Sequence, residues 1–323
     1  MILVTGGAGY IGSHYVQYER DRGNEVVVLD NLTLGHREAV EGVAVVVGDV
    51  GSSDVLDTVF RSYPVSAVVH FAALASVPES VEHPERYYRN NVVAVVELLD
   101  AMVRHGIPFL VFSSSCATYG EPRYVPIDEE HPQHPISPYG ESKRVCERMM
   151  EAYEKAHGIC FVSLRYFNAA GADPEARIGE SHEPETHLIP IVLQVASGRR
   201  DAVTIYGDDY DTPDGTCVRD YVHVLDLAQA HALALDRLCA GGPSGYFNLG
   251  SETGYSVREV IDTCRRVTGR DIRADRGPRR PGDPPRLVAS AQQARRLLGW
   301  EPKHSDIEVI VRTAWEWERR RRF

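Results

Sequence analysis

The sequence has no closely spaced cysteine pair, no long apolar run and no excess of positive charge. Its six cysteines are scattered without a CxxC motif, which argues against a zinc site or a disulfide framework and is typical of a reducing compartment. No apolar stretch reaches transmembrane length, and the amino-terminal segment Met1 to Thr5 carries no basic leader. We therefore expect a cytoplasmic protein without a membrane partner and without a metal.

The charge balance is acidic, because 46 Asp and Glu residues outnumber 35 Lys and Arg residues and give a net charge of −11. A general nucleic-acid binder normally presents a basic surface, so no nucleic-acid partner is expected. The run Arg319 to Arg322 resembles a targeting patch, but four cations also suit the solvated carboxyl end of a helix, and we favour that interpretation.

The first half of the chain alternates short β-branched runs with helical segments. Near-continuous Val, Ile, Leu and Phe runs are typical of strands that are buried on both faces of a parallel sheet. This alternation predicts an α/β fold, a doubly wound parallel sheet with right-handed crossovers. Expected strands are Ile2–Thr5, Glu25–Leu29, Val43–Val47, Ala67–Phe71, Phe109–Ser113 and Cys160–Arg165, and expected helices are Ile11–Arg22, Asp54–Ser62, Glu85–His105 and Tyr139–His157.

After Phe167 the pattern changes to Gly, Pro, Asp and Glu with shorter helices. At 323 residues the chain is long enough for two domains. We expect a Rossmann-type domain over residues 1–168 and a smaller lobe over residues 169–323, with a soft boundary and the chain free to cross back. The lobe should pack over the carboxyl ends of the strands, where ligands bind in such folds.

A glycine-rich loop connects the first strand to the first helix. Gly6, Gly9 and Gly12 follow a GxxGxxG spacing, and this strand–loop–helix context predicts a dinucleotide-binding site. Glycine lets backbone N–H groups approach a pyrophosphate, while the helix N-terminus supplies partial positive charge.

Asp30 ends the second strand, at the position where a carboxylate accepts hydrogen bonds from both ribose hydroxyls and repels a 2′-phosphate. This favours NAD over NADP, although Asp30 and Asn31 also suit a simple loop. Asp49 and Val50 follow the third strand and are candidates for the adenine edge, but an aspartate there is also a common helix cap.

Tyr139 and Lys143 are spaced four residues apart, which places both side chains on one face of a helix. A neighbouring ammonium and a cationic nicotinamide should favour the phenolate and lower the pKa of the tyrosine. Ser115 ends the fifth strand, where its hydroxyl is placed to bind a reacting oxygen; Ser113 and Ser114 are expected mainly to end the strand.

These motifs identify the chain as similar to the extended short-chain dehydrogenase/reductase superfamily, and closely similar to its UDP-glucose (UDP-galactose) 4-epimerase family. The resemblance covers almost the whole length, and the second-lobe segments are the most specific. The segments that carry it are VTGGAGYIGSH, LDNL, HFAAL, NNV, FSSSCATYG, SPYGESK, LRYFNAAGA, IYGDDYDTPDGTCVRDYVHVLDLA and RRPGDPPRLVAS.

The resemblance implies an NAD-binding first domain, a UDP-sugar-binding lobe and the catalytic residues Ser115, Tyr139 and Lys143. It implies NAD contacts from Gly6, Gly9, Tyr10, Ile11, Gly12, Asp30, Asn31, Asp49, Val50, Phe71, Ala72, Ala73, Asn91, Ser113, Tyr139, Lys143 and Tyr166. It implies substrate contacts from Ser115, Tyr139, Asn168, His187, Leu188, Thr204, Tyr206, Arg219, Arg280, Asp283 and Leu287.

The implied reaction is 4-epimerisation of UDP-hexoses through a transient 4-keto sugar, by a homodimer that pairs helices 85–105 and 139–157. Three positions depart from the family pattern. Ala75 stands where a lysine near the NAD phosphates is frequent, and His187 stands where asparagine is common. Leu287 replaces a tyrosine found in some members, which gives the hypothesis that UDP-GalNAc and UDP-GlcNAc are also substrates.

Two alternatives stay open at this point: a UDP-glucuronate 4-epimerase, and a catalytically silent NAD-binding sensor or scaffold. A 4,6-dehydratase is disfavoured, because Cys116 and Ala117 follow Ser115 where that chemistry needs an additional acid.

Overall fold

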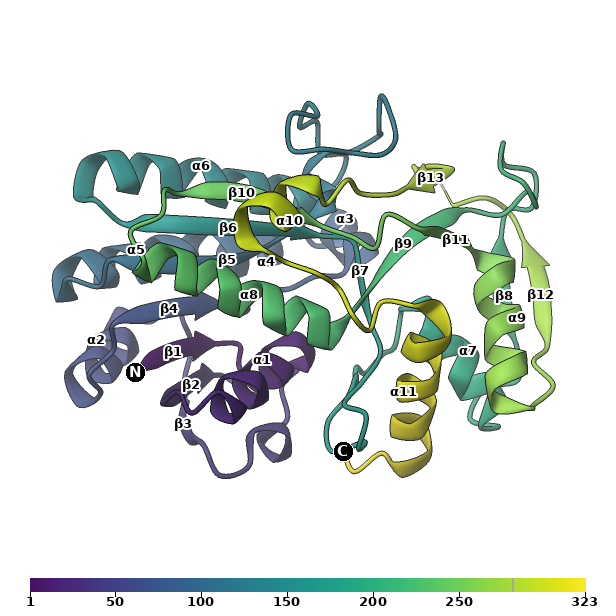
Figure 1. Cartoon of the computed structure of the whole chain (residues 1–323), viewed down its shortest axis with the longest axis horizontal. Helices are drawn as coiled ribbons and strands as arrows, with labels where there is room; N and C mark the ends of the chain where they lie inside the picture. The colour runs from purple at the N-terminus through teal and green to yellow at the C-terminus, as the bar shows by residue number, and fades with distance from the viewer. Residues whose placement is uncertain (281) are drawn as a thin grey trace.

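The computed structural model describes residues 1–280 and 282–323. Seven parallel strands form the central sheet in the order β10-β6-β5-β4-β1-β2-β3 (Figure 1). The strands are β1 (Ile2–Thr5), β2 (Val26–Asp30), β3 (Ala44–Val47), β4 (Ala67–His70), β5 (Phe109–Ser115), β6 (Cys160–Tyr166) and β10 (Gly245–Leu249). The predicted doubly wound parallel sheet is confirmed, and the six strands expected in the first half of the chain each begin within one residue of the expected position.

Helices cover both faces of this sheet. One apolar cluster joins the sheet to α1 (Tyr10–Asp21) and α8 (Val224–Cys239), and a second joins it to α2 (Ser53–Ser62), α5 (Ala94–His105) and α6 (Pro138–His157). All residues of β1, β2 and β4 are buried, which explains why their sequences lack polar alternation. The strand ends on the carboxyl side therefore form a fixed edge.

The chain returns to this sheet late in the sequence. α8 packs along α1, and β10 pairs in parallel with β6, with Gly245 opposite Val162. Residues 224–249 therefore lie with the first half of the chain in space, although they follow the soft boundary expected at residue 168. A division by sequence position alone does not describe the two regions.

The second lobe is built from two small sheets and three helices (Figure 1). Its core packs α7 (Leu188–Ala196), α9 (Val257–Thr268) and α11 (Ile307–Arg320) together. The strands are β7 (Asn168–Ala170), β8 (Val203–Tyr206), β9 (Val218–His223), β11 (Gly254–Ser256), β12 (Ala274–Gly277) and β13 (Arg286–Leu287). The short helix α10 (Gln292–Leu298) leads back towards β10.

The helix expected over residues 85–105 is interrupted. The structure has α3 (Val77–Glu82), α4 (Pro84–Tyr87), a wide π-helical turn at Tyr88–Val93 and then α5. The wide turn contains Asn91, whose side chain bonds two other segments, and such turns are frequent at functional sites. Among residues 1–280 and 282–323, no helix is long and apolar enough to cross a membrane.

Candidate active site at the carboxyl edge of the sheet

The glycine loop between β1 and α1 is closely packed against the segment that follows β4. Gly6 has φ +70°, and a Cβ there would lie 2.5 Å from the backbone nitrogen of Ala72. A Cβ on Gly12 would lie 2.2 Å from the Gly6 carbonyl oxygen. Side chains are therefore excluded at both positions, and the free N–H groups at the start of α1 fit a pyrophosphate.

Asp30 lies at the end of β2 beside this loop. Its carboxylate is buried and accepts hydrogen bonds from the N–H groups of Ala8 (2.9 Å) and Leu32 (2.8 Å). These bonds fix the carboxylate at the loop and leave it lone pairs for ribose hydroxyls. The Asn31 amide lies 3.3 Å from Asp49, which is exposed. The cradle and the carboxylate together fit an adenosine dinucleotide without a 2′-phosphate.

Asn91 connects the cofactor side to α6. Its side-chain oxygen accepts from the Leu74 N–H (2.9 Å), and its amide nitrogen donates to the Leu74 carbonyl (2.9 Å) and to Ser142 Oγ (3.1 Å). Asn91 therefore holds the segment after β4 in place beside the predicted NAD contacts Phe71, Ala72 and Ala73. Ala75, in the same segment, is exposed.

The structure brings Ser115, Tyr139 and Lys143 together at the carboxyl edge of β5. Ser137 caps α6 by accepting the Gly140 N–H (3.2 Å), so Tyr139 and Lys143 lie on the first two turns. All three predicted catalytic residues are buried, with exposed fractions of 7% for Ser115, 8% for Tyr139 and 4% for Lys143.

The Lys143 ammonium contacts the strand rather than the tyrosine. Its Nζ donates to the Ser113 carbonyl (2.8 Å) and lies 4.9 Å from the centre of the Phe112 ring. Ser113 in turn shares a 2.6 Å hydroxyl–hydroxyl contact with Tyr166, another predicted NAD contact. Polar contacts thus link α6, β5 and β6 close to the carboxyl ends of these two strands.

Burial dominates the ionisation of this group. It raises the pKa of Tyr139 well above its ordinary value, as does the neighbouring Tyr166, while interaction with the Ser115 hydroxyl partly opposes the rise. Burial also lowers the pKa of Lys143 to about 8. The lowering of the tyrosine pKa expected from the sequence involves the ammonium together with a cationic nicotinamide; in the chain by itself, desolvation dominates and raises this pKa.

The predicted substrate residues of the second lobe are arranged along β9 and the segment that ends at β13. Arg219 donates to Asp283 and, at 2.8 Å, to the Val218 carbonyl. The Asn168 amide donates to the Asp220 carbonyl (2.8 Å). The guanidinium and the carboxylate predicted to hold a UDP group therefore pair with each other here.

Further members of the predicted substrate set line an open cleft of about 600 Å³ that includes Arg280 and Asp283. The Arg280 guanidinium lies 4.0 Å from the centre of the Tyr206 ring, so the cation lies over an aromatic ring that is itself exposed. Leu287 lies on β13 opposite Arg219 and is partly buried, while Thr204 lies on β8, in the separate two-stranded sheet with β12.

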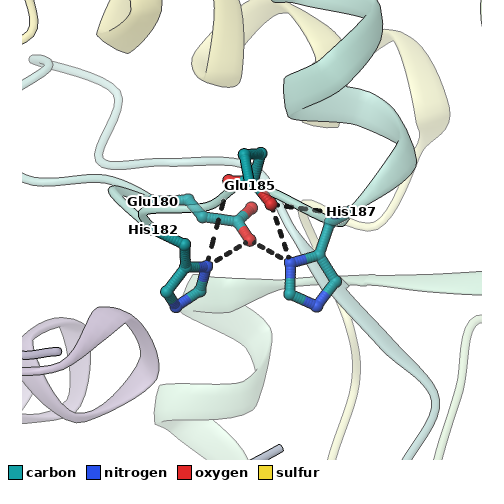
Figure 2. Close-up of side chains that lie close together, drawn as sticks. All are labelled: Glu180, His182, Glu185 and His187. Carbon is teal, nitrogen blue, oxygen red and sulfur yellow. Dashed lines mark hydrogen bonds and ion pairs between the residues drawn. The ribbon is translucent and has the colours of Figure 1, made fainter. Parts of the chain in front are cut away.

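His187 and Leu188 mark the N-terminus of α7. His187 does not cap the helix; its Nδ1 lies 2.7 Å from Glu180 and 3.1 Å from Glu185, within a compact group that also includes His182 (Figure 2). The sequence interpretation treated His187 as a substrate contact and missed the other three. The available signal was the density of ligand-type residues, since five of the eight positions from 180 to 187 are His or Glu.

Two buried carboxylates that support the site were also missed. Glu147, one helical turn after Lys143, accepts from Ser114 (2.7 Å) and forms a double contact with Arg165 (2.9 and 2.7 Å). Asp220 accepts from the N–H groups of Ser251 (2.7 Å) and Ala289 (3.1 Å). For Glu147 the sequence does contain an indication, because its spacing from Tyr139 and Lys143 places it on the same helix face.

Comparison with known proteins places this arrangement among characterised relatives. The sequence model of the NAD dependent epimerase/dehydratase family matches residues 2–250. The UDP-glucose 4-epimerase of Halalkalibacterium halodurans is 53% identical over 318 residues, which cover 98% of this chain and 95% of that protein.

Solved structures agree closely with the fold. A crystal structure of UDP-glucose 4-epimerase has a TM-score of 0.97 at 48% identity and covers 99% of this chain and 98% of that chain. The Bifidobacterium longum UDP-glucose 4-epimerase in complex with NAD⁺ and UDP has a TM-score of 0.94 at 37% identity, again covering 99% and 98%.

Proposed function

The chain belongs to the NAD dependent epimerase/dehydratase family, and on that premise we propose that its site inverts the 4-hydroxyl of UDP-hexoses. The protein is an isomerase that interconverts UDP-galactose and UDP-glucose through a transient 4-keto sugar, with NAD as cofactor. The observation that carries this proposal is the meeting of Tyr139, Lys143 and Ser115 at the carboxyl edge of β5. The relatives do not favour a glucuronate epimerase or a silent sensor.

NAD suits the residues of the first half. Asp30 would hold the adenosine ribose, and the N–H groups at the start of α1 would face the pyrophosphate. When bound, NAD⁺ supplies a reversible hydride acceptor and a positive charge near the site.

In this proposal Tyr139 takes the proton of the sugar 4-hydroxyl and returns it when the ketone is reduced from its opposite face. Ser115, within interacting reach of the tyrosine, holds the reacting oxygen. Lys143 keeps positive charge under the site through its bond to the Ser113 carbonyl. Because burial raises the pKa of Tyr139, the phenolate forms only when nearby positive charge offsets the desolvation.

The UDP group would be held by the second lobe. The Arg219 guanidinium has five N–H donors, and its bonds to Asp283 and Val218 leave others for a diphosphate. Tyr206 and Arg280 together offer an exposed platform for the uracil ring. Firm binding of the nucleotide with loose binding of the hexose allows the keto sugar to turn over between the two half-reactions.

Leu287 supports a broader substrate range. Its side chain packs against the cluster of Tyr119, Ile127, Phe167 and Ala289 and is smaller than tyrosine. We therefore propose turnover of UDP-GalNAc as well as UDP-galactose, and Leu287→Tyr should lower the first rate more than the second. Equal losses for both substrates in a chromatographic assay would remove Leu287 from this role.

A homodimer and a cytoplasmic location complete the proposal. α5 and α6 lie side by side on one face of the sheet, joined by the Tyr153–Asp100 hydrogen bond (2.6 Å), and the nearby Val93 is 53% exposed. Light scattering after size-exclusion chromatography is expected to give twice the mass of one chain. A single-chain mass at micromolar concentration would oppose a stable dimer.

The deciding experiment is to incubate the purified protein with UDP-galactose, without added reductant, and to separate UDP-glucose by chromatography. Tyr139→Phe should lower the turnover about 10²–10⁴-fold, the usual contribution of a general acid–base group, while bound NAD is retained. If the wild type converts UDP-galactose and Tyr139→Phe converts it at the same rate, the assigned role of Tyr139 is rejected. No conversion by the NAD-loaded wild type would reject the function.

A further inference from the structure

Four side chains of metal-ligating type converge in the segment between β7 and α7. Glu180, His182, Glu185 and His187 each offer one donor atom, and these four atoms all lie within 4.8 Å of one another. Figure 2 shows the two carboxylates between the two imidazole rings, with the Nδ1 atom of each ring turned inwards. The group lies outside the proposed chemistry at Tyr139.

The distances between the histidine nitrogens and the glutamate oxygens are close to those between ligand atoms around one ion. His187 Nδ1 lies 2.7 Å from Glu180 and 3.1 Å from Glu185. His182 Nδ1 lies 3.1 Å from Glu180 and 3.9 Å from Glu185. His182 and His187 face different oxygens of Glu185. A tetrahedral ion with bonds of about 2.0–2.1 Å separates its ligand atoms by roughly 3.3 Å, so each of these four pairs would change its separation by at most about 0.6 Å to hold an ion.

The two carboxylates are withdrawn from water, with exposed side-chain fractions of 6% for Glu180 and 4% for Glu185. Buried carboxylates need a compensating cation or a metal. The imidazoles of His182 and His187 are 27% and 51% exposed, so an ion can reach the group from solvent.

Neighbouring backbone and aromatic groups hold the donors in place. Glu185 accepts hydrogen bonds from the N–H groups of Thr186 (2.7 Å) and His187 (2.8 Å), which orient its carboxylate. The Trp317 indole donates to the Glu180 carbonyl (2.8 Å), and a Cβ on Gly179 would lie 2.3 Å from that indole. Such outer contacts orient the ligands of protein metal sites.

We propose that Glu180, His182, Glu185 and His187 bind one divalent transition-metal ion, with Zn²⁺ the best match to two imidazoles and two carboxylates. Imidazole favours Zn²⁺ and its neighbours over Mg²⁺ or Ca²⁺, which take oxygen ligands. Four protein ligands close the shell, so the ion is structural and takes no part in the epimerisation.

The position of the ion gives it a mechanical role. The His182 ring meets the Tyr10 ring edge-on at 6.3 Å, and Tyr10, in the glycine loop, donates to the Gly171 carbonyl (2.6 Å). His187 immediately precedes α7. The ion therefore joins the cofactor loop to the helix that carries the predicted nucleotide contact Leu188.

The test is a Zn²⁺ titration of the NAD-loaded protein after removal of metals with a chelator, in competition with a chromophoric chelator. We expect one Zn²⁺ per chain, a higher melting temperature on saturation, and a tetrahedral absorption spectrum when Co²⁺ is used instead. Mg²⁺ at the same concentration should produce no change.

Matched variants locate the site. The double substitution His182→Ala/His187→Ala, and separately the milder Glu185→Gln, should weaken Zn²⁺ binding by about 100-fold or more, since they remove ligands rather than outer contacts. The control His83→Ala alters an imidazole of an exposed pair with Glu85 (3.7 Å) and should leave binding unchanged.

Two results would overturn the proposal. One is the absence of stoichiometric Zn²⁺ binding to the folded wild type, which would leave the group as an ion-pair cluster that is held by protonated imidazole. The other is stoichiometric binding that survives in both ligand variants. Neither depends on UDP-hexose turnover, so failure of the metal site is separate from failure of the proposed function.

Discussion

The cofactor half and the substrate half of the site are stabilised in different ways. Around the glycine loop, backbone groups approach each other so closely that a single Cβ would collide with a carbonyl or an amide. In the second lobe, charged side chains pair with each other, as Arg219 does with Asp283, and Asp283 also lines an open cleft.

We infer that the closely packed residues stabilise the fold, whereas the exposed side chains can exchange their present contacts for a ligand. Close backbone packing and buried pairs such as Glu147–Arg165 cannot change without disrupting the sheet. The exposed face of Tyr206 and the Arg280 guanidinium can accept a ligand at little cost to the fold. We therefore expect the NAD side to bind its ligand with little change and the side chains of the UDP side to rearrange.

The strongest test of this comparison is Glu147→Gln. It leaves the buried Arg165 charge without its partner and should lower the free energy of unfolding by about 3–5 kcal/mol in urea denaturation. Glu308→Gln alters an exposed glutamate–arginine pair with Arg266 (3.3 Å) and should cost at most about 1 kcal/mol. Similar losses in the free energy of unfolding for the two variants would contradict the difference between buried and exposed pairs.

The second test uses pH. Burial lowers the pKa of Lys143 in the folded chain to about 8 from 10.5, so between these values the unfolded chain binds more protons at this residue. The free energy of unfolding of the wild type should therefore rise relative to Lys143→Met by about 3 kcal/mol between pH 8 and 10.5. Urea denaturation of both NAD-free proteins checks this, and a pH-independent difference would contradict it.

A smaller effect is expected from Gly12→Ala. The added methyl group would meet the Gly6 carbonyl oxygen, so we expect a loss of about 1–3 kcal/mol in stability together with loss of NAD from the purified protein. Gly245→Ala is the control, because a Cβ there meets nothing nearer than 3.7 Å. Full retention of NAD by Gly12→Ala would show that the loop is less rigid than its packing indicates.

The smallest effect on stability is expected in the cleft. Arg280→Ala removes an exposed contact with Tyr206 and should change the free energy of unfolding by at most about 1 kcal/mol. The same substitution should raise the KM for UDP-galactose several-fold, because it removes the cation from the platform proposed for the uracil ring. Arg296→Ala, at an exposed position of α10, should change neither quantity. A large stability loss for Arg280→Ala alone would contradict the difference between the two halves.

The sequence predicted the sheet and its glycine loop well, because buried parallel strands and a strand–glycine–helix junction each follow from local pattern. It did not predict the wide turn at Tyr88–Val93, since that turn depends on bonds from Asn91 to Leu74 and Ser142. Periodicity alone describes a continuous helix there.

In the candidate site, too, local sequence pattern predicted some features and not others. The spacing of Tyr139 and Lys143 predicted one helix face, and the structure places both there. Burial raises the pKa of Tyr139 in the chain by itself, and the sequence does not display that burial; the lowering expected from the ammonium together with the nicotinamide stays a prediction. The pairing of Arg219 with Asp283 joins residues 64 positions apart, and no local pattern encodes such a contact.

The late return of β10 to the sheet has a consequence for synthesis on the ribosome. β6 is complete at Tyr166, but its outer edge stays uncovered until Leu249 has been translated and has left the exit tunnel. During that interval the nascent chain presents an unpaired strand edge, a surface on which chains associate wrongly. The translation time of about eighty residues is therefore the period in which chaperone protection matters most for this protein.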